Sequence, residues 1–349
     1  MALLKWGALL KRGAQREWGR RLVRLGAGLG LALALSACAA SYQPMGPIVS
    51  EPRLTGAALV AGDGFELPMR IWQPAEGPAR GVIVALHGFN DYSNAFDGAG
   101  KYLAENGIAV YAYDQRGFGR TRERGIWPGA DTLVSDLKAA VQVVRGNHPG
   151  VPVYLMGESM GGAVVLATLT DRDAPRVDGA ILVAPAVWGR ETMGFFPRTA
   201  LWLAYNLVPG MTMTAPRELK IQPSDNIEML RALGRDPLVI KGTRVDAING
   251  LTDLMDRALA SCGKLKVPSL VLYGANEQVL PPRPVMRAIR TFEDSGRHVV
   301  AVYPKGYHML LRDLEGETVL ADIASWIHNP GIPLASGADR GPRALVAAR

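Results

Sequence analysis

The stretch "VYLMGESMGGAVVLATL", residues 153–169, joins two different patterns of apolar residues. Residues 153–156 form a short apolar run typical of a buried strand, and residues 160–169 form a longer run that predicts a helix. Between them Ser159 stands in the pattern Gly-x-Ser-x-Gly, with Gly157 and Gly161 two residues away on either side. Such a pattern is typical of a sharp strand-to-helix turn that exposes a nucleophilic hydroxyl. Serine is also a common helix N-cap, so the rest of the chain has to distinguish a nucleophile from a cap.

Strand-like and helix-like runs alternate on both sides of this stretch. Residues 57–61 and 67–72 flank "GDG" and predict a hairpin. The further expected strands are residues 82–86, 108–113, 153–156, 180–183, 269–273 and 298–303, and the expected helices are residues 95–105, 132–145, 160–169, 284–291 and 317–327. This alternation predicts an α/β fold with a mostly parallel, doubly wound sheet, whose chemistry lies at the carboxyl ends of its strands.

The alternation breaks between residues 183 and 267. Within this gap "FFPRTALWLAYNLVPGMTM", residues 195–213, is apolar, aromatic and rich in Met. It predicts either additional core helices or a cap whose apolar face lines a substrate tunnel or touches a membrane. We expect a helical cap at about residues 186–263, because an insertion at this point of the chain lies above the functional edge of the sheet.

The two ends of the chain differ in charge from the part between them. Of the formal net charge of +7, residues 1–37 contribute +6 and residues 329–349 contribute +2, which leaves −1 for the remainder. The sequence therefore gives no indication of nucleic-acid binding. Residues 329–349 are rich in Pro, Gly, Ala and Arg, and we expect a disordered tail.

The N-terminal segment has the organisation of a targeting signal. A basic stretch is followed by an apolar run of 11 residues, 25–35, which is too short to span a bilayer. The run ends in "LSAC", residues 35–38, which resembles the bacterial lipoprotein box; an ordinary secretory signal is the alternative. Arg20 and Arg21 match a twin-arginine signal only loosely.

The lipoprotein resemblance implies a signal peptide over residues 1–37 and a membrane anchor of acyl chains on Cys38. Residues 38–52 would form the lipidated cysteine and a linker, followed by the folded domain at residues 53–328. Ala39 after the cysteine, rather than Asp, favours the outer membrane, with the protein facing the periplasm. Cys262 would then be the one remaining cysteine, a small buried hydrophobe without a disulfide partner.

A serine nucleophile needs a base and an acid. Among five histidines, His308 in "PKGYHMLL" follows the last expected strand and should lie at the same edge of the sheet as Ser159. In this class of site the acid lies between serine and histidine in the chain, and Glu277 follows the expected strand at residues 269–273. The backbone N–H groups of Met160 and Phe89 would form the oxyanion hole. No metal site is indicated.

Five segments together resemble the α/β-hydrolase family, in particular its monoacylglycerol lipase and lysophospholipase group: "LHGFNDYS", "YDQRGFGRT", "MGESMGG", "LYGANEQVLPP" and "KGYHMLLRD". The resemblance extends from about residue 56 to residue 328. It implies a serine ester hydrolase that needs no cofactor and acts on acylglycerols or lysophospholipids. Residues 114–119 resemble the structural Asp-x-Arg-Gly-x-Gly loop of that family. One departure is Glu277, where the family usually carries Asp; the longer side chain requires a shifted loop.

The leading hypothesis is a lipid-anchored esterase or lipase that forms an acyl-enzyme at Ser159. A related acyltransferase is an alternative, as is an S33-type aminopeptidase, which needs carboxylates to hold the amine of its substrate. The stretch at residues 195–213 contains no acidic residue, which favours an apolar acyl chain. A catalytically inactive scaffold lipoprotein is a third alternative. Head group, acyl chain length and oligomeric state are left open by the sequence.

Overall fold

A single large sheet organises the molecule. The computed structural model describes residues 39–214 and 220–340. Within this part of the chain nine strands form one sheet in the order β1-β2-β3-β5-β4-β6-β7-β10-β11. The strands from β5 to β11 in that order are parallel, whereas β1, β2 and β3 are joined by antiparallel pairing, as is β3 to β5. The bounds are β1 Arg53–Leu54, β2 Ala58–Val60, β3 Glu66–Trp72, β4 Gly81–Leu86, β5 Ile108–Tyr113, β6 Val153–Glu158, β7 Gly179–Val183, β10 Ser269–Gly274 and β11 His298–Tyr303.

The order of the strands reverses direction at β4. The chain passes from β4 to β5 on one side and then returns to place β6 on the other side of β4. A reversal of this kind opens a crevice at the carboxyl ends of the two neighbouring strands, where ligands bind in doubly wound sheets. The expectation of a mostly parallel, doubly wound sheet is confirmed.

Helices cover both faces of the sheet, because successive strand residues point to opposite faces. Val82 and Val84 of β4 belong to the core on the side of α3, α4, α7 and α8, whereas Ile83 and Ala85 belong to the core on the side of α2 and α9. The bounds are α2 Asp97–Glu105, α3 Ala130–Asn147, α4 Met160–Leu169, α7 Val245–Ser261, α8 Pro282–Asp294 and α9 Gly316–His328, with short 3₁₀ turns η1 Ser93–Phe96, η3 Cys262–Lys264 and η4 Leu310–Arg312.

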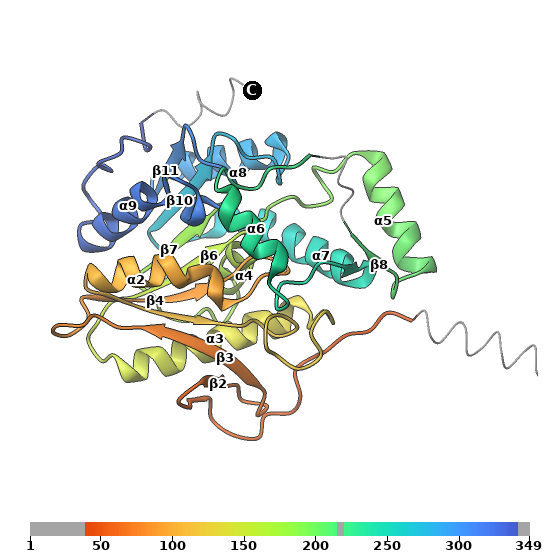
Figure 1. Ribbon diagram of the computed structural model, residues 1–349, viewed down its shortest axis with the longest axis horizontal. Helices are drawn as coiled ribbons and strands as arrows, with labels where there is room; N and C mark the ends of the chain where they lie inside the picture. The colour runs from red at the N-terminus through yellow and green to blue at the C-terminus, as the bar shows by residue number, and fades with distance from the viewer. Residues whose placement is uncertain (1–38, 215–219, 341–349) are drawn as a thin grey trace, which may run out of the picture.

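A cap lies over one end of the sheet and is narrower than predicted. It consists of α5 Phe195–Leu207, α6 Ile227–Arg235 and a short antiparallel pair, β8 Thr212–Met213 with β9 Thr243–Arg244. Figure 1 shows α5 and β8 at the right-hand side of the molecule. The predicted cap at residues 186–263 also included α7, but α7 packs against α4 and α3, and its Leu254 and Ala258 are part of the core. The cap proper therefore ends before Val245.

Both ends of the described chain pack against the fold, which corrects two expectations. Residues 41–46, the strap, form hydrogen bonds to the cap and to the core instead of acting as a free linker. The predicted disorder of residues 329–349 is wrong for residues 329–340, since Leu334 and Ala338 are buried and the Val302 N–H donates to the Ala338 carbonyl at 2.9 Å.

The predicted targeting segment at residues 1–37 and the predicted lipidation residue Cys38 lie outside the described residues. Among the helices that the structure describes, none combines the length and apolar character needed to cross a bilayer.

Candidate active site

Ser159 lies at the tight turn between β6 and α4. Its φ of 53° and ψ of −114° are unusual for a residue other than glycine, and such strain is often found at functional turns. The Ser159 side chain makes no capping hydrogen bond to α4, which disfavours the N-cap alternative. The Ser159 carbonyl accepts hydrogen bonds from the N–H groups of Ala163 and Ala186, so the turn is fixed from two sides.

The two glycines of the turn are required by close backbone contacts. A Cβ atom on Gly157 would overlap the backbone of Gly161, and a Cβ atom on Gly161 would overlap the carbonyl of Leu86 at the end of β4. The turn therefore packs directly on the neighbouring strand. This arrangement presents Ser159 at the carboxyl ends of β4 and β6, as the sequence predicts.

His308 and Glu277 meet beside this turn. His308 follows β11 and Glu277 follows β10, and His308 Nδ1 lies 2.6 Å from Glu277 Oε2. The other carboxylate oxygen, Oε1, accepts the backbone N–H groups of Val279 at 2.6 Å and Leu280 at 3.0 Å. Because the carboxylate only accepts, Nδ1 carries the proton, and Nε2 is left to act as a base.

Each partner shifts the pKa of the other. Burial raises the pKa of Glu277, but the charge and hydrogen bond of His308 outweigh burial and the pKa is lowered. Burial lowers the pKa of His308, but the charge and hydrogen bond of Glu277, together with the charge of Glu158, outweigh burial and the pKa is raised. The pair is thus arranged to stabilise a protonated imidazole.

The two expected oxyanion donors belong to segments next to Ser159. Met160 is the first residue of α4, so its N–H has no partner inside the helix. Phe89 lines the same cavity as Ser159, in the loop that follows β4. A Cβ atom on Gly88 would come within 3.5 Å of Ser159 Cβ, so the loop approaches the serine closely.

His87 holds this loop in place. Its Nδ1 donates to the Gly88 carbonyl at 2.8 Å and its Nε2 accepts the Gln115 N–H at 2.9 Å. Burial lowers the pKa of His87, which fits the neutral tautomer that these two bonds require. The other three histidines have contacts away from Ser159: His148 with Tyr111, His298 with Phe292 and His328 with Asn106.

Ser159 and His308 open into a cavity of about 470 Å³. Its wall is mostly apolar and comes from the cap, from α7 and from the loops that follow β4, β7, β10 and β11. The apolar lining residues are Phe89, Ala186, Trp188, Met193, Pro197, Leu201, Pro223, Ile248, Leu251, Met255, Val279, Leu280 and Met309. The cavity is suited to an apolar group that extends to Ser159.

The same cavity contains a buried group of three charges that sequence reasoning missed. Arg312 donates to Asp91 at 2.8 Å and to both carboxylate oxygens of Glu158 at 3.3 and 3.4 Å. Burial lowers the pKa of Arg312, but the charges of Glu158 and Asp91 outweigh burial and the pKa is raised. Arg312 thus joins the loop of the expected oxyanion donor, the serine turn and the loop that follows His308. The three charged residues stand in the segments "HGFND", "GES" and "HMLLRD". No local sequence pattern in these segments indicates that the three side chains meet.

Three other acidic residues between Ser159 and His308 in the chain, Asp253, Asp256 and Asp294, are alternatives to Glu277 that lie in helices. Asp253 and Asp256 of α7 form ion pairs with Arg190 at 2.6 and 2.5 Å, and Asp294 is the last residue of α8. Cys262 is buried, and burial raises its pKa to about 12. Within the described residues no group of three or more His, Cys, Asp or Glu side chains is arranged to hold a metal ion.

Comparison with known proteins identifies similar sequences and similar solved structures. The chain is 26% identical over 276 residues to the monoacylglycerol lipase of Mycolicibacterium smegmatis, covering 76% of this chain and 93% of that protein. It is 26% identical over 274 residues to the monoglyceride lipase of Homo sapiens, and this match covers 77% of this chain and 89% of the human protein. The crystal structure of the Paleococcus ferrophilus monoacylglycerol lipase superimposes with a TM-score of 0.63 at 23% identity, covering 75% of this chain and 98% of that one.

The family described as serine aminopeptidase, S33 (Hydrolase_4) matches residues 77–315. This range extends from just before β4 to the residues that follow Arg312, and it includes Ser159, Glu277 and His308. The match spans more than half of the chain, and the fold is the one that its structural neighbours share. The protein belongs to the serine aminopeptidase S33 family of α/β-hydrolases.

Proposed function

We propose that the protein is a serine ester hydrolase that cleaves fatty acyl esters of the monoacylglycerol or lysophospholipid type through an acyl-enzyme at Ser159. One observation carries this proposal: a serine on a strained turn opens into the same apolar cavity as a histidine whose other ring nitrogen is bonded to a buried carboxylate. The names of the relatives support esters of glycerol as substrates.

In the proposed reaction, Ser159 Oγ attacks the ester carbonyl while His308 Nε2 takes its proton. Glu277 holds the imidazole and stabilises its charge. The N–H groups of Met160 and Phe89 stabilise the negative charge that develops on the carbonyl oxygen. His308 then protonates the departing alcohol, and a water molecule, activated in the same way, releases the fatty acid. The chemistry requires no cofactor.

A panel of substrates tests this proposal with the chain that begins at Ser41. We expect turnover of p-nitrophenyl esters, monoacylglycerols and lysophospholipids, and no turnover by Ser159→Ala or His308→Ala. Members of a triad act as a unit, so the double variant should lose little beyond either single one. A fluorophosphonate probe should label the parent protein and not Ser159→Ala. More than a few per cent of residual turnover in Ser159→Ala would contradict the assignment.

The same panel separates the alternatives. An S33-type aminopeptidase needs free carboxylates for the substrate amine. Asp91 and Glu158 do line the cavity, but Arg312 is bonded to both of them, which favours an uncharged substrate. Amino-acyl p-nitroanilides should therefore remain uncleaved. An acyltransferase would form a new ester when glycerol is added, and an inactive scaffold lipoprotein would cleave nothing.

We further propose that residues 1–37 are a lipoprotein signal peptide and that Cys38 carries the lipid anchor. The protein would then lie at the bacterial cell envelope, at the outer membrane facing the periplasm. The basic, apolar and small-residue order that ends in "LSAC" supports this part of the proposal.

A further inference from the structure

The part of the cap that leads into α6 lies against the loop of the candidate base. We call residues 222–226 the clasp, and residues 304–314, which follow β11, the histidine loop. The Met309 N–H, next to His308 in the chain, donates to the Pro223 carbonyl at 2.9 Å. The clasp therefore contacts the backbone directly beside the imidazole.

The clasp also contacts the loop of the candidate acid. The Gln222 N–H donates to Oε1 of Gln278 at 3.1 Å, and Gln278 is the residue after Glu277. Pro223 of the clasp and Met309 of the histidine loop both line the active-site cavity. One short segment of the cap is thus bonded to both loops and borders the cavity.

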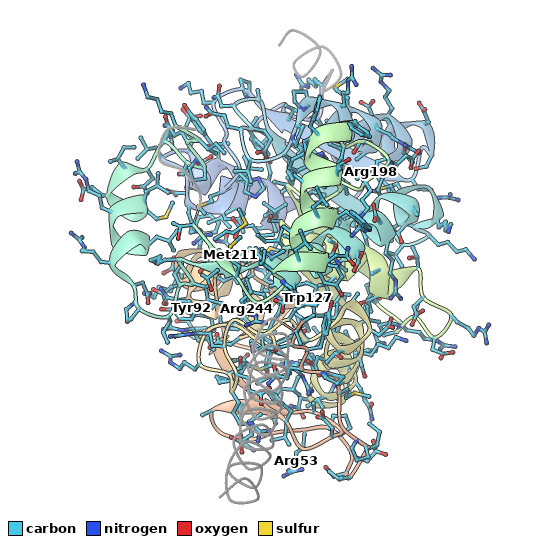
Figure 2. All side chains as sticks on the ribbon, turned by 90° about the vertical axis from the view of Figure 1, so that its right-hand side faces the viewer. Arg53, Tyr92, Trp127, Arg198, Met211 and Arg244 are labelled. Carbon is cyan, nitrogen blue, oxygen red and sulfur yellow. The ribbon has the colours of Figure 1, made fainter. Side chains whose placement is uncertain are left out.

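The clasp belongs to the α6 part of the cap. Figure 1 shows α6 across the middle of the molecule and α5 at its right-hand side. Figure 2, turned by 90°, again shows the two helices apart, with Arg198 on α5. The Asn226 side chain of the clasp caps α6 by accepting the Met229 N–H at 3.1 Å. The clasp is therefore continuous with α6 and not with α5.

Asp313 joins the clasp to the histidine loop. Its Oδ1 accepts the Ser224 hydroxyl at 2.6 Å, and its Oδ2 accepts the Tyr307 N–H at 2.7 Å. Both Asp313 and Ser224 are buried. Tyr307 directly precedes His308 in the chain. The Asp313 carboxylate thus fixes the backbone on one side of His308, and the Met309 N–H bond to the clasp fixes it on the other.

The two contacts of Asp313 require a carboxylate. Two donors reach two different oxygens, whereas an amide offers only one acceptor oxygen. Burial raises the pKa of Asp313 to about 6. The hydrogen bonds from Ser224 and Tyr307 lower this pKa, and the charges of Asp225 and Glu158 raise it. In neutral solution Asp313 is therefore ionised, and both of its oxygens are acceptors.

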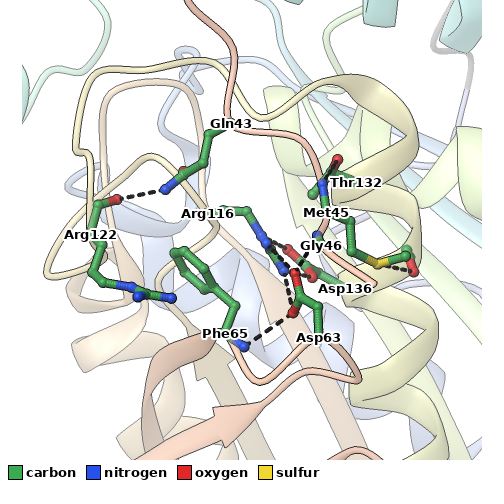
Figure 3. A network of polar contacts seen from close by, with 10 residues as sticks. Gln43, Met45, Gly46, Asp63, Phe65, Arg116, Arg122, Thr132 and Asp136 are labelled. Carbon is green, nitrogen blue, oxygen red and sulfur yellow. Dashed lines mark hydrogen bonds and ion pairs between the residues drawn. The ribbon is translucent and has the colours of Figure 1, made fainter. Parts of the chain in front are cut away.

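Other buried carboxylates of this protein are held differently. Figure 3 shows Asp63 and Asp136, which both pair with Arg116, at 2.7 and 2.8 Å. A cation at this distance offsets the cost of burying their charge. The oxygens of Asp313 instead accept an N–H group and a hydroxyl. The burial of this charge thus serves two contacts that both lie beside the candidate active site.

Two further bonds fasten the histidine loop to the clasp. The Asn226 side-chain amide donates to the Arg312 carbonyl at 3.0 Å, and the Leu314 N–H donates to Asp225 Oδ1 at 2.9 Å. The Arg312 side chain binds the loop of the expected oxyanion donor and the serine turn, as described above. The histidine loop is therefore held between the core and the cap.

The start of the histidine loop is fixed by the core. The Asn276 N–H donates to the Gly306 carbonyl at 2.8 Å. A Cβ atom on Gly274, at the end of β10, would overlap the backbone of Gly306, so the two segments are in close contact. The contacts of Asp313 and the clasp begin at the next residue, Tyr307, and continue beyond His308.

We propose that Asp313 is a positioning residue for His308 and that it acts together with Ser224 of the cap. These contacts keep the imidazole at bonding distance from Glu277, with His308 at the wall of the cavity. The inference rests on the proposed use of His308 as the base. The bond between His308 and Glu277 can nevertheless be measured without any substrate.

The pKa of His308, measured by NMR of the protein with isotope-labelled histidine, tests the positioning directly. Burial lowers this pKa, Glu277 and Glu158 raise it, and Arg312 lowers it. A looser contact with Glu277 weakens the largest of the contributions that raise it. In Asp313→Asn we therefore expect the pKa of His308 to fall by about half a unit or more. An unchanged pKa would overturn the proposal.

Ser224→Ala separates an effect of geometry from an effect of charge. It removes the hydroxyl that Asp313 accepts and changes no charge. The pKa of His308 should therefore fall in this variant too, by a smaller amount. A fall in Asp313→Asn alone would indicate a direct effect of the lost charge and would contradict the role of the cap.

Turnover in mildly alkaline buffer, where Asp313 is ionised and His308 neutral, gives a second measurement. Misplacing a catalytic group by about 1 Å costs about 10²-fold in rate. Asp313→Asn should lower kcat at least about tenfold and change KM less than about threefold, since the chemical step is affected rather than binding. The rate of fluorophosphonate labelling should fall in parallel.

The double variant shows whether the two residues act through one contact. Ser224→Ala should lower kcat less than Asp313→Asn does. Combining the two substitutions should lower kcat no further than Asp313→Asn alone, because residues that share one contact are coupled. Fully additive losses would show that Ser224 and Asp313 act independently and would contradict the proposal.

Asp322 provides a matched control. It is a buried carboxylate of α9 that accepts the hydroxyls of Tyr303 and Ser336. Asp322→Asn should lower the midpoint of thermal unfolding and leave the kcat of the protein and the pKa of His308 unchanged. Equal effects of Asp322→Asn and Asp313→Asn on kcat would indicate general loosening and overturn the positioning role. If the parent protein turned over no ester, the proposed function would fail, and the pKa of His308 would still decide this inference.

Discussion

At the scale of a single residue, the activity of the candidate triad depends on Glu277. Its side chain is one methylene longer than the aspartate usual in the monoacylglycerol lipase group that the sequence resembles. The Glu277 carboxylate nevertheless reaches His308 and accepts hydrogen bonds from two backbone N–H groups. Glu277→Gln should lower kcat by about 10⁴-fold, the loss typical of replacing a triad carboxylate by an amide. Glu277→Asp keeps the charge and should lose activity only partly. Ester turnover measures both variants.

The competing acids provide the control for this prediction. Asp256→Asn breaks an ion pair with Arg190 and should leave kcat within a few-fold of the parent value. If Glu277→Gln were active and Asp256→Asn or Asp294→Asn inactive, the acid would lie at that other position. Ser159 and His308 would keep their assignments after such a result.

The three buried charges beside His308 predict a pH effect. In the proposed mechanism hydrolysis requires neutral His308, so we expect activity to fall as the pH drops through the pKa of His308, which is raised above the ordinary value of 6.5. The charge of Glu158 raises this pKa and that of Arg312 lowers it. Glu158→Gln should move the acidic limb of kcat/KM to lower pH, and Arg312→Gln should move it to higher pH. Shifts in the same direction would show that the charges do not act through His308.

Sequence order was sufficient to predict which polar residues accompany Ser159. His308 and Glu277 each follow a strand of the same parallel sheet, so their meeting follows from topology. The joining of Asp91, Glu158 and Arg312 does not follow from any local pattern. This contact depends on the conformations of three separate loops after their strands, and tertiary packing alone determines those conformations.

At the scale of whole elements, the periodic segments were predicted well. The helix at residues 160–169 and the strand at residues 298–303 coincide with α4 and β11, because their apolar runs end at Thr170 and at Pro304. The two-residue strand β1 was missed, since two residues carry no period. Helix α7 was predicted as part of the cap because it lies inside the insertion, but its buried side faces α4.

The C-terminal segment was predicted as disordered from composition, and packing explains why part of it is not. Leu334 is 2% exposed in the core on the side of α2 and α9. Leu334→Ala should lower the free energy of unfolding by about 2–5 kcal/mol, the usual effect of truncating a buried leucine. Ile332→Ala, in the same segment but exposed, should change it by less than about 0.5 kcal/mol. Urea denaturation measures both, and equal effects would argue against the packing of this segment.

At the scale of the whole molecule, positive charge is segregated at the ends of the chain, and the part between them is nearly neutral. Metabolic labelling with a palmitate analogue should mark the protein, and Cys38→Ser should abolish the label. That variant should wash off membranes, because it lacks the several acyl chains that anchor a protein stably. An unlabelled and freely soluble parent protein would contradict the anchor.

Residues 329–340, which include Ala338, stabilise the fold and also limit the pairing of the edge strand β11 with other molecules. β11 is an outer strand of the sheet, and the backbone of this segment occupies the Val302 N–H that such a strand would otherwise offer to another chain. At the opposite margin β1 is only two residues long. Proteins gathered on a membrane surface meet one another at high local concentration, where open strands template aggregation. If the proposed lipid anchor gathers this protein on a membrane, the bonded N–H on β11 at one edge and the very short strand β1 at the other would protect it against strand-to-strand polymerisation there.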